Sequence, residues 1–581
     1  MQAAHQRDSR VNLFNNGHTT TRVLVLCLLL VAVCYANSIT NAFILDDILI
    51  VGANERIRHI EPVQFLFQSY WGDLNHAGIY RPLTIFSFSL EYPIWGVWAP
   101  GFRITNLLLH AVNGWLVFLL ARGLLGSPAA ALASAAVYLI HPVQTEAVVS
   151  IVGRSELLAA GLFFSAWLAF RKRRTWLAAV AYFLAALAKE SAITLPAIVI
   201  LELALSQAGS EVSMGGNVSR WQLAIRNIVE SWRRLAVLAI TGVAYLGLRF
   251  YVLGGLGIPA SGQYLHGTLT LFQRWMTSGR VFLEYCKLLL APVEIASDYD
   301  FNSIPVAGLA DWDAWLGLAL VAATVILAVR VAKLRPTVSF GVLFFFIALL
   351  PVSNWIMPIA LMMAERFLYI PMFGFALLAG ALWAGIQDRG PRHLIAGGFV
   401  IIAALLCIGH NYIWQDTLTF HRNAVRVVPN NARARLGYGF ALLRVDKVPE
   451  AKEQFEAGLR ILPNSAPLLA GLASATMRID GNCERVRPLV AQALTNDTRQ
   501  WHSLWVLGDC FMMEGKIEQA EKSYRLAIQN TDFPDAQLLF SWARILEARG
   551  NTPTALATYE RAALIDPTDE GIKMKIRQLT R

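Results

Sequence analysis

Two adjacent carboxylates, Asp46 and Asp47, follow the first long apolar run of the chain, which extends from Val23 to Leu45. A carboxylate is costly to place against lipid, so a paired carboxylate at the end of such a run indicates chemistry or an ion site more often than scaffolding. Chemistry at this position would be that of an enzyme that acts on a membrane-bound substrate. Alternatively, both cap a helix that begins near Ile48, since Asp is a favoured N-cap residue.

Four later segments each place a cation beside a carboxylate within apolar surroundings. From their proximity in the sequence we predict the pairs Arg81 with Glu91, Arg154 with Glu156, Lys189 with Glu190, and Arg366 with Glu365. Buried charges need partners, so these pairs either fasten loops together or line a phosphate-binding cavity. In the second case the four cations would stabilise a phosphate leaving group by preorganised positive charge.

Further polar residues complete the candidate site. His141, which precedes Pro142, either donates a hydrogen bond to a sugar or phosphate or caps a helix end. We assign His141, Glu190 and Glu365, together with the four cations, to the part of the site that would bind the phosphate and a sugar attached to it, which we call the donor side. The part that would bind the second substrate, the acceptor side, is assigned the remaining carboxylates, which are Glu91, Glu156, Asp298 and Asp300.

The composition indicates that most of the chain lies in a bilayer. Of 581 residues, 56% are hydrophobic and only 15% are charged, a depletion that is foreign to soluble domains of this size. The net charge of +10 resides in short basic clusters between apolar runs, which favours retention of those loops in the cytoplasm. Nucleic acid is therefore not an expected partner.

Apolar runs of this length predict about eleven transmembrane helices. They lie near residues 22–43, 104–121, 128–146, 155–170, 175–191, 193–206, 234–253, 314–332, 338–356, 366–386 and 394–412. The basic clusters then predict an inside N-terminus and an outside C-terminus, with both aspartates outside. Charges interrupt 272–293, which favours an interfacial helix, although a twelfth span would reverse the parity. The first run could also be a cleaved signal peptide, but it is longer than the usual core of such signals.

Beyond residue 412 the composition becomes polar and a repeat appears. Pro429 and Pro463 are 34 residues apart, and the stretches at 451–465, 520–536 and 555–569 share small, aromatic and turn residues. A 34-residue period with two helices per unit is typical of tetratricopeptide repeats, whose concave groove usually holds an extended peptide. Cys483 and Cys510 fall within this domain, where a disulfide is possible.

The chain has neither a Walker loop, nor a dinucleotide fingerprint, nor Cys/His spacing suited to zinc. An activated donor would therefore come from elsewhere, and membranes carry activated sugars as polyprenyl phosphates. No cofactor is expected to be required, and a divalent metal is not expected.

Several motifs in one order carry a family resemblance. They are "FILDDILIVGANERI", "YRPLTIFSFSLEYPIWGVWAPGFRITNLLLHAVN", "HPVQTEAVVSIVGRSELLAA", "AKESAIT" and "AERFLYIP". Together they resemble the transmembrane O-mannosyltransferases with tetratricopeptide repeats (the TMTC family), whose membrane half is similar to protein O-mannosyltransferases of the GT-C superfamily. The resemblance implies inverting transfer of mannose from dolichyl or polyprenyl phosphate to Ser or Thr hydroxyls. It also places the catalytic acid at Asp46 and Asp47, of which we favour Asp46 as the base.

The expected architecture is all-α, with a GT-C-type transmembrane bundle followed by a tetratricopeptide-repeat α-solenoid. We divide it into a cytoplasmic segment 1–21, a catalytic domain 22–412 with an outside loop 44–103, and repeats 413–581. The expected partners are a lipid-linked sugar donor and a protein or peptide acceptor held by the repeats. The expected location is a bacterial inner membrane with periplasmic repeats, or an endoplasmic reticulum membrane with lumenal repeats. Two alternatives stay open, a GT-C enzyme that glycosylates a lipid or glycan and a non-catalytic membrane scaffold.

Overall fold

A computed structural model describes residues 17–72, 78–205, 220–255, 269–296, 299, 303–359, 361–386, 389–531, 535–566 and 569–580. These residues form helices and turns, and their one β-type pairing is an isolated bridge between Ser69 and Gly72. The chain divides into two compact units. The membrane unit comprises residues 1–42, 56–295 and 304–415, and the repeat unit comprises 43–55, 296–303 and 416–581.

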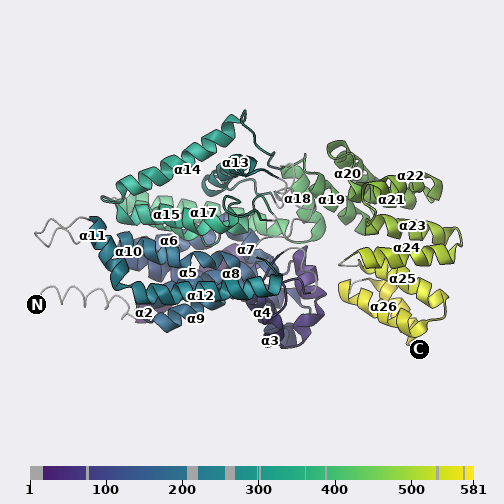
Figure 1. Cartoon of the computed structure of the whole chain (residues 1–581), viewed down its shortest axis with the longest axis horizontal. Coiled ribbons are helices and arrows are strands. Elements are labelled where there is room, and N and C mark those ends of the chain that lie inside the picture. The colour runs from purple at the N-terminus through teal and green to yellow at the C-terminus, as the bar shows by residue number, and fades with distance from the viewer. Residues whose placement is uncertain are drawn as a thin grey trace, which may run out of the picture. The chain divides into compact units, whose positions relative to one another are not determined.

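The membrane unit is a bundle of apolar helices (Figure 1). Its main helices are α2 (Gly17–Tyr35), α5 (Ala99–Leu125), α6 (Pro128–Ile140), α8 (Arg154–Arg171), α9 (Thr175–Ala188), α10 (Leu195–Leu205), α12 (Trp232–Leu253), α14 (Trp312–Val331), α15 (Pro336–Leu349), α16 (Met372–Gly385) and α17 (Arg389–Ile413). Glycines allow close helix approach, because a Cβ at Gly374 in α16 would collide with the carbonyl oxygen of Gly341 in α15. Small residues at helix crossings are typical of packing within membranes.

Each of the eleven predicted spans coincides with one of these helices, but eleven crossings are not confirmed. Within the described residues, six helices are long and apolar enough to cross a membrane. They lie within Thr19–Ser38, Ala99–Leu125, Ile151–Arg171, Trp232–Leu253, Trp312–Val331 and Leu394–Ile413. Four shorter apolar helices lie at Pro128–Ile140, Thr175–Ala188, Pro336–Val352 and Met372–Gly385. Helix α13 (Leu271–Leu290), predicted to be interfacial, is not among the spanning candidates in the described chain.

The predicted outside loop 44–103 is largely helical. It contains a π-helical turn η3 (Ile48–Gly52), a 3-10 turn η4 (Glu55–Arg58), α3 (Pro62–Leu66) and α4 (Pro82–Trp95). Residues 43–55 group with the repeats, because η3 packs against α26 (Thr552–Ile565). The sequence-based assignment of this segment to the catalytic domain did not anticipate that packing.

The repeat unit stacks helices in antiparallel pairs. After α18 (Thr417–Val427) the pairs are α19 (Ala432–Arg444) with α20 (Val448–Ile461), α21 (Ala466–Asp480) with α22 (Cys483–Asn496), α23 (Trp501–Met513) with α24 (Ile517–Asn530), and α25 (Ala536–Ala548) with α26, followed by α27 (Glu570–Leu579). These four pairs confirm the predicted tetratricopeptide-repeat architecture.

The aromatic residues of the repeated stretches lie in the core of the repeat unit. Phe455, Tyr524 and Tyr559 are buried, each on the second helix of its pair. Gly439 and Gly471 both face the Phe455 ring so closely that any Cβ there would collide with it. Cys483 and Cys510 form a disulfide between α22 and α23, with their Cα atoms 5.6 Å apart. The disulfide that the sequence left open is therefore present.

Candidate functional site

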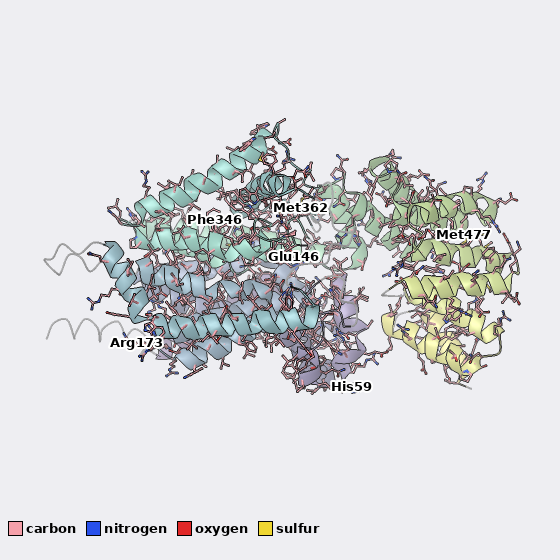
Figure 2. The ribbon with its side chains drawn as sticks, viewed as in Figure 1. His59, Glu146, Arg173, Phe346, Met362 and Met477 are labelled. Atoms are coloured by element: carbon pink, nitrogen blue, oxygen red, sulfur yellow. A yellow bond between two sulfur atoms is a disulfide. The ribbon has the colours of Figure 1, made fainter. Side chains whose placement is uncertain are left out.

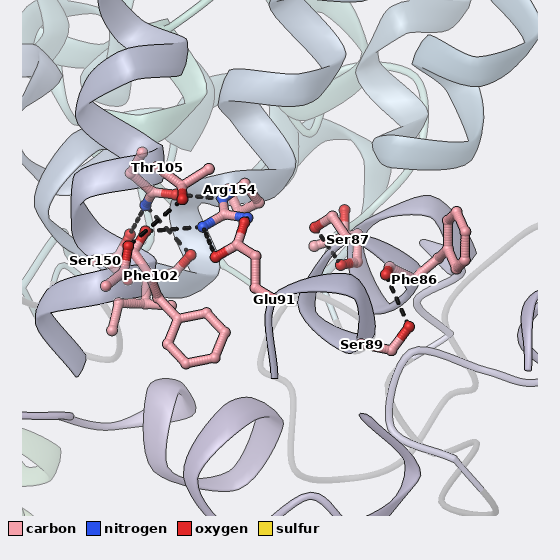
Figure 3. Close-up of polar contacts among 12 residues, drawn as sticks. Phe86, Ser87, Ser89, Glu91, Phe102, Thr105, Ser150 and Arg154 are labelled. Carbon is pink, nitrogen blue, oxygen red and sulfur yellow. Dashed lines mark hydrogen bonds and ion pairs between the residues drawn. The ribbon is translucent and has the colours of Figure 1, made fainter. Parts of the chain in front are cut away.

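The charged residues of the predicted site pair with partners other than their neighbours in the sequence. Arg154, at the start of α8, donates to both carboxylate oxygens of Glu91 in α4, at 2.5 and 3.2 Å (Figure 3). It also donates to the carbonyl oxygen of Phe102 at 2.8 Å and to the side chain of Asn106. Its side chain is only 1% exposed. Each of the three guanidinium nitrogens of Arg154 thus donates to an acceptor within the protein. The predicted pair of Arg154 with Glu156 is therefore wrong.

Lys189 is the second of the four predicted cations that is fully buried. Its ammonium group bonds the carboxylate of Glu156 and lies 5.2 Å from the centre of the Phe367 ring. Both members of this pair are at most 3% exposed, so the attraction between them compensates two desolvated charges. The predicted pair of Lys189 with Glu190 is therefore also wrong.

Glu190 instead receives Arg81, which precedes α4. The guanidinium donates from Nη2 and Nε to the two carboxylate oxygens, at 2.7 and 3.2 Å. This geometry replaces the predicted pair of Arg81 with Glu91. Glu190 keeps 31% side-chain exposure, so this pair remains partly accessible.

Arg366, in the fourth of the charged segments, bonds a carboxylate that the sequence analysis did not single out. Its Nη1 lies 2.5 Å from Glu146 Oε1, and its backbone N–H donates to Glu146 Oε2 at 2.9 Å. Figure 2 labels Glu146 within the membrane unit. Arg366 is 30% exposed, and its Nε and Nη2 make no hydrogen bond within the described residues. Arg366 and Arg81, which is 15% exposed, are therefore more accessible than Arg154 and Lys189.

Three segments are connected pairwise by these ion pairs. Arg81 links α4 to the turn η8 (Glu190–Thr194), Arg154 links α8 to α4, and Lys189 links the start of η8 to α8. Because each ion pair joins a different two of the three segments, we call the set the charge triangle. Arg366 attaches η11 (Glu365–Leu368) to the segment that contains Glu146.

The two aspartates differ in exposure. Asp46 is exposed, whereas Asp47 is buried, with 1% exposure. Asp47 occupies the N-cap position of η3, but its side chain makes no capping hydrogen bond, so the capping alternative is not supported for Asp47. Leu45, directly before the pair, has a positive φ of 50°, which is costly for a residue with a Cβ. Backbone strain of this kind clusters at functional sites.

Arg103 holds the chain immediately before the aspartates. From α5 it donates to the carbonyl oxygens of Asn41 at 2.6 Å, Ala42 at 3.2 Å and Ile39 at 3.2 Å, and to that of Val149 at 2.9 Å. Its side chain is buried. Sequence reasoning missed Arg103 because no carboxylate accompanies it in the chain. An arginine at the edge of an apolar predicted span was the available signal.

The other predicted site residues have the following positions. His141 accepts a hydrogen bond from the backbone N–H of Val143 through Nδ1 and donates from Nε2 to the carbonyl oxygen of Leu289. Both ring nitrogens are thus engaged within the protein, which favours the capping interpretation of His141. Glu365 is buried at the start of η11. Asp298 and Asp300 lie outside the described residues.

The fold and the charged segments define a class of protein: a multi-helix membrane protein that carries a tetratricopeptide-repeat unit. No protein-family model matches the chain. The chain is similar to the protein O-mannosyl-transferase TMTC3 of Mus musculus, with 26% identity over 484 residues, which cover 76% of this chain and 51% of the relative. It is also similar to the protein O-mannosyl-transferase Tmtc1 of Drosophila melanogaster, with 26% identity over 72% of this chain and 59% of the relative.

A third relative, the protein O-mannosyl-transferase TMTC4 of Mus musculus, is 27% identical over 70% of this chain and 62% of its own length. The resemblance carried by the motifs is thereby confirmed. The chain spans between about half and three fifths of the lengths of these relatives.

Among solved structures, the chain is similar to the tetratricopeptide-repeat protein TTC0263 of Thermus thermophilus, with a TM-score of 0.24 and 19% identity over 32% of this chain and 94% of that chain. It is also similar to the repeat protein YrrB, with a TM-score of 0.19 and 20% identity over 28% of this chain and 81% of that chain.

Proposed function

We propose that this protein is a membrane glycosyltransferase that moves mannose from a polyprenyl or dolichyl phosphate to Ser or Thr hydroxyls of exported polypeptides. The observation that carries the proposal is the diacid Asp46–Asp47 after a strained Leu45, in a chain similar to protein O-mannosyl-transferases. The lipid-linked donor, the inverting course and the acceptor are parts of the proposal.

In the proposed step a Ser or Thr oxygen attacks C1 of the lipid-linked mannose from the face opposite the phosphate. The new C1–O bond forms as the bond from C1 to the phosphate oxygen breaks, and the configuration at C1 inverts. The hydroxyl proton passes to a carboxylate, and the lipid phosphate leaves with the bonding electron pair. Asp46 is the proposed base because its carboxylate is exposed, and buried Asp47 is proposed to orient the acceptor.

The leaving phosphate needs positive charge that it can reach. Arg366 and Arg81 are the proposed phosphate ligands, because both keep solvent exposure beyond their ion pairs. Their planar guanidinium groups match the geometry of phosphate oxygens. Arg154 and Lys189 are instead assigned to holding the segments together. The proposed reaction uses no metal and no further cofactor.

The proposed orientation places the repeats on the outside, in a periplasm or an endoplasmic reticulum lumen. The Cys483–Cys510 disulfide supports this, since disulfides persist in oxidising compartments and are rare in the cytosol. The repeats are proposed to hold the polypeptide acceptor.

The test compares exported proteins from cells that carry the native chain, Asp46→Asn, or Asp47→Asn, by intact-mass measurement. We expect a hexose-sized mass increment with the native chain and its loss with Asp46→Asn, since removal of a general base costs on the order of 10²–10⁴-fold in rate. Asp480→Asn, which changes a carboxylate in the repeat unit, is the matched control and should leave the increment intact.

Two outcomes contradict the proposal. An increment that persists in the Asp46→Asn variant and also in the Asp47→Asn variant would indicate that the diacid is not catalytic. An increment confined to lipids or glycans would indicate a transferase with a different acceptor.

A further inference from the structure

The repeat unit contains a pocket of about 230 Å³. Its walls come from four successive repeats: Phe440 from α19, Arg478 from α21, Trp505 from α23 and Gln537 from α25. Pockets that take drug-sized ligands have roughly 300–1,000 Å³, so this one suits a single compact ring. The pocket belongs to the repeat unit alone and involves none of the residues assigned to catalysis.

One wall of the pocket is aromatic. The rings of Trp501 and Trp505 are nearly parallel, with an interplanar angle of 8° and centroids 6.3 Å apart. The His502 ring lies 5.1 Å from Trp501 and 4.9 Å from Trp505, and Phe440 lies 4.7 Å from His502. Burial lowers the pKa of His502 to about 4, so this imidazole is neutral near pH 7. The wall is therefore an aromatic and uncharged surface.

The other lining residues include planar, polar groups. Arg444 Nη2 bonds Asp535 Oδ2 at 2.9 Å, and this ion pair joins α19 to the start of α25 across 91 residues of sequence. Arg478 donates from Nη1 to the carbonyl oxygen of Leu443 at 2.9 Å. Its Nε and Nη2 make no hydrogen bond within the described part of the repeats. Guanidinium and carboxylate groups thus line the pocket together with the aromatic wall.

We infer that this pocket binds a hexopyranose ring, in particular a mannosyl group already attached to a polypeptide. A pyranose presents an apolar C–H face, which stacks on an aromatic wall, and a rim of hydroxyls, which accept from Arg and donate to Asp. That the hexose is mannose on a Ser or Thr rests on the proposed function. The pocket would retain a modified polypeptide on the enzyme for further transfer.

The lining of the pocket favours a sugar ring over a passing peptide strand. The Arg444–Asp535 ion pair bridges the first and last paired repeats at the pocket, so an extended chain would have to displace it. A single sugar ring can enter beside the ion pair, where its hydroxyls can donate to the carboxylate oxygens of Asp535. The ion pair also balances one of the two arginine charges, which weakens the attraction for a purely acidic peptide.

The test measures peptide binding to the full chain in lipid nanodiscs by fluorescence anisotropy. The probes are a labelled Ser/Thr peptide with one α-mannosyl group and the same peptide without it. All samples carry Asp46→Asn, so that no transfer occurs. We expect at least about tenfold tighter binding of the mannosylated probe, which corresponds to about 1.4 kcal/mol, and competition by methyl α-mannoside. Trp505→Ala and Arg478→Gln should each remove the preference, whereas Trp232→Ala, an exposed tryptophan of the membrane unit, should retain it.

Equal affinity for the two probes, or a preference that survives both pocket variants, overturns the inference. Loss of all peptide binding with Trp505→Ala in a folded protein would instead assign the pocket to the peptide itself. If Trp505→Ala fails to fold, the exposed Arg478→Gln decides the question. Sugar binding without any transferase activity of the native chain would refute the proposed function and leave the pocket assignment standing.

Discussion

Arg103 donates a hydrogen bond of 2.6 Å to the carbonyl oxygen of Asn41, which shortly precedes Asp46 in the chain. The same guanidinium reaches the carbonyl oxygens of Ile39 and Ala42. Asn41 is fixed a second time, because its side chain donates to the carbonyl oxygen of Asn411 at 2.9 Å. The chain that leads into the diacid is therefore anchored to α5 and to the end of α17. Anchoring of this kind keeps reactive groups in a defined geometry.

Arg103→Lys should lower the free energy of unfolding and slow transfer, although both aspartates are retained. A single ammonium group cannot reach all four carbonyl oxygens, and two lost charge-assisted bonds of about 1.5 kcal/mol each give about 3 kcal/mol. Thermal unfolding in detergent and mass-based transfer measure the two effects. Arg330→Lys, in α14 and exposed, is the control. An unchanged melting temperature would show that the segment 39–42 is held by other contacts.

Lys189→Met should destabilise the membrane unit by about 3–5 kcal/mol, because it leaves the buried carboxylate of Glu156 uncompensated. The double variant Lys189→Met with Glu156→Leu should recover most of that loss, since replacing a buried pair by apolar residues is often neutral. Thermal unfolding in detergent measures both effects, and we expect the double variant to remain active. If the double variant is stable but inactive, the original prediction that Lys189 binds the phosphate would be supported instead.

The Cys483–Cys510 disulfide should form in the cell and stabilise the repeats. Its sequence separation of 27 residues corresponds to about 3.5 kcal/mol in the chain-entropy description. Cys483→Ala with Cys510→Ala should lower the melting temperature of the repeat unit. Maleimide labelling of native membranes should modify these two cysteines only after reduction. Labelling without a reductant would place the repeats in a reducing compartment.

Asp509 should make the repeat unit less stable as pH rises from about 4 to about 6. Burial raises the pKa of its carboxyl to about 6, while the Tyr524 hydroxyl donates to it at 2.6 Å. Because the folded pKa exceeds the unfolded value, the stabilisation is complete below the unfolded pKa and is lost as pH rises through the folded pKa, by about 3 kcal/mol.

The matching variant is Asp509→Asn, which keeps an acceptor for Tyr524. The free energy of unfolding of this variant should exceed that of the native chain at pH 7 and approach it at pH 4. The depressed pKa of His502 acts in the opposite direction in both proteins, so the difference between them isolates Asp509. A difference that does not change with pH would contradict the prediction.

The helices were predictable because apolar length and the 34-residue period are local properties. The span 104–121 lies within helix α5, and Tyr524 and Tyr559 are buried as the repeat pattern requires. The helix α4 was missed because a 14-residue helix in a loop has neither the length of a span nor an obvious amphipathic pattern.

The ion pairs were not predictable, because proximity in the sequence does not determine contacts between segments. Lys189 and Glu190 are adjacent in the chain, yet they bond residues 33 and 109 positions away. Local spacing indicated which segments carry charges that form ion pairs, but it gave the wrong partners. The importance of Glu146 depended on Arg366, which lies 220 residues later.

The charge triangle constrains how this protein can change over evolutionary time. A substitution that removes one of the two buried cations, Arg154 or Lys189, leaves a buried carboxylate without its partner, so we expect single replacements there to be tolerated less well than paired ones. Viable divergence would proceed by paired exchanges, with the residues at 91 and 154, or 156 and 189, changing together. Distant descendants would then keep the linkage pattern even where the amino acids themselves have been replaced.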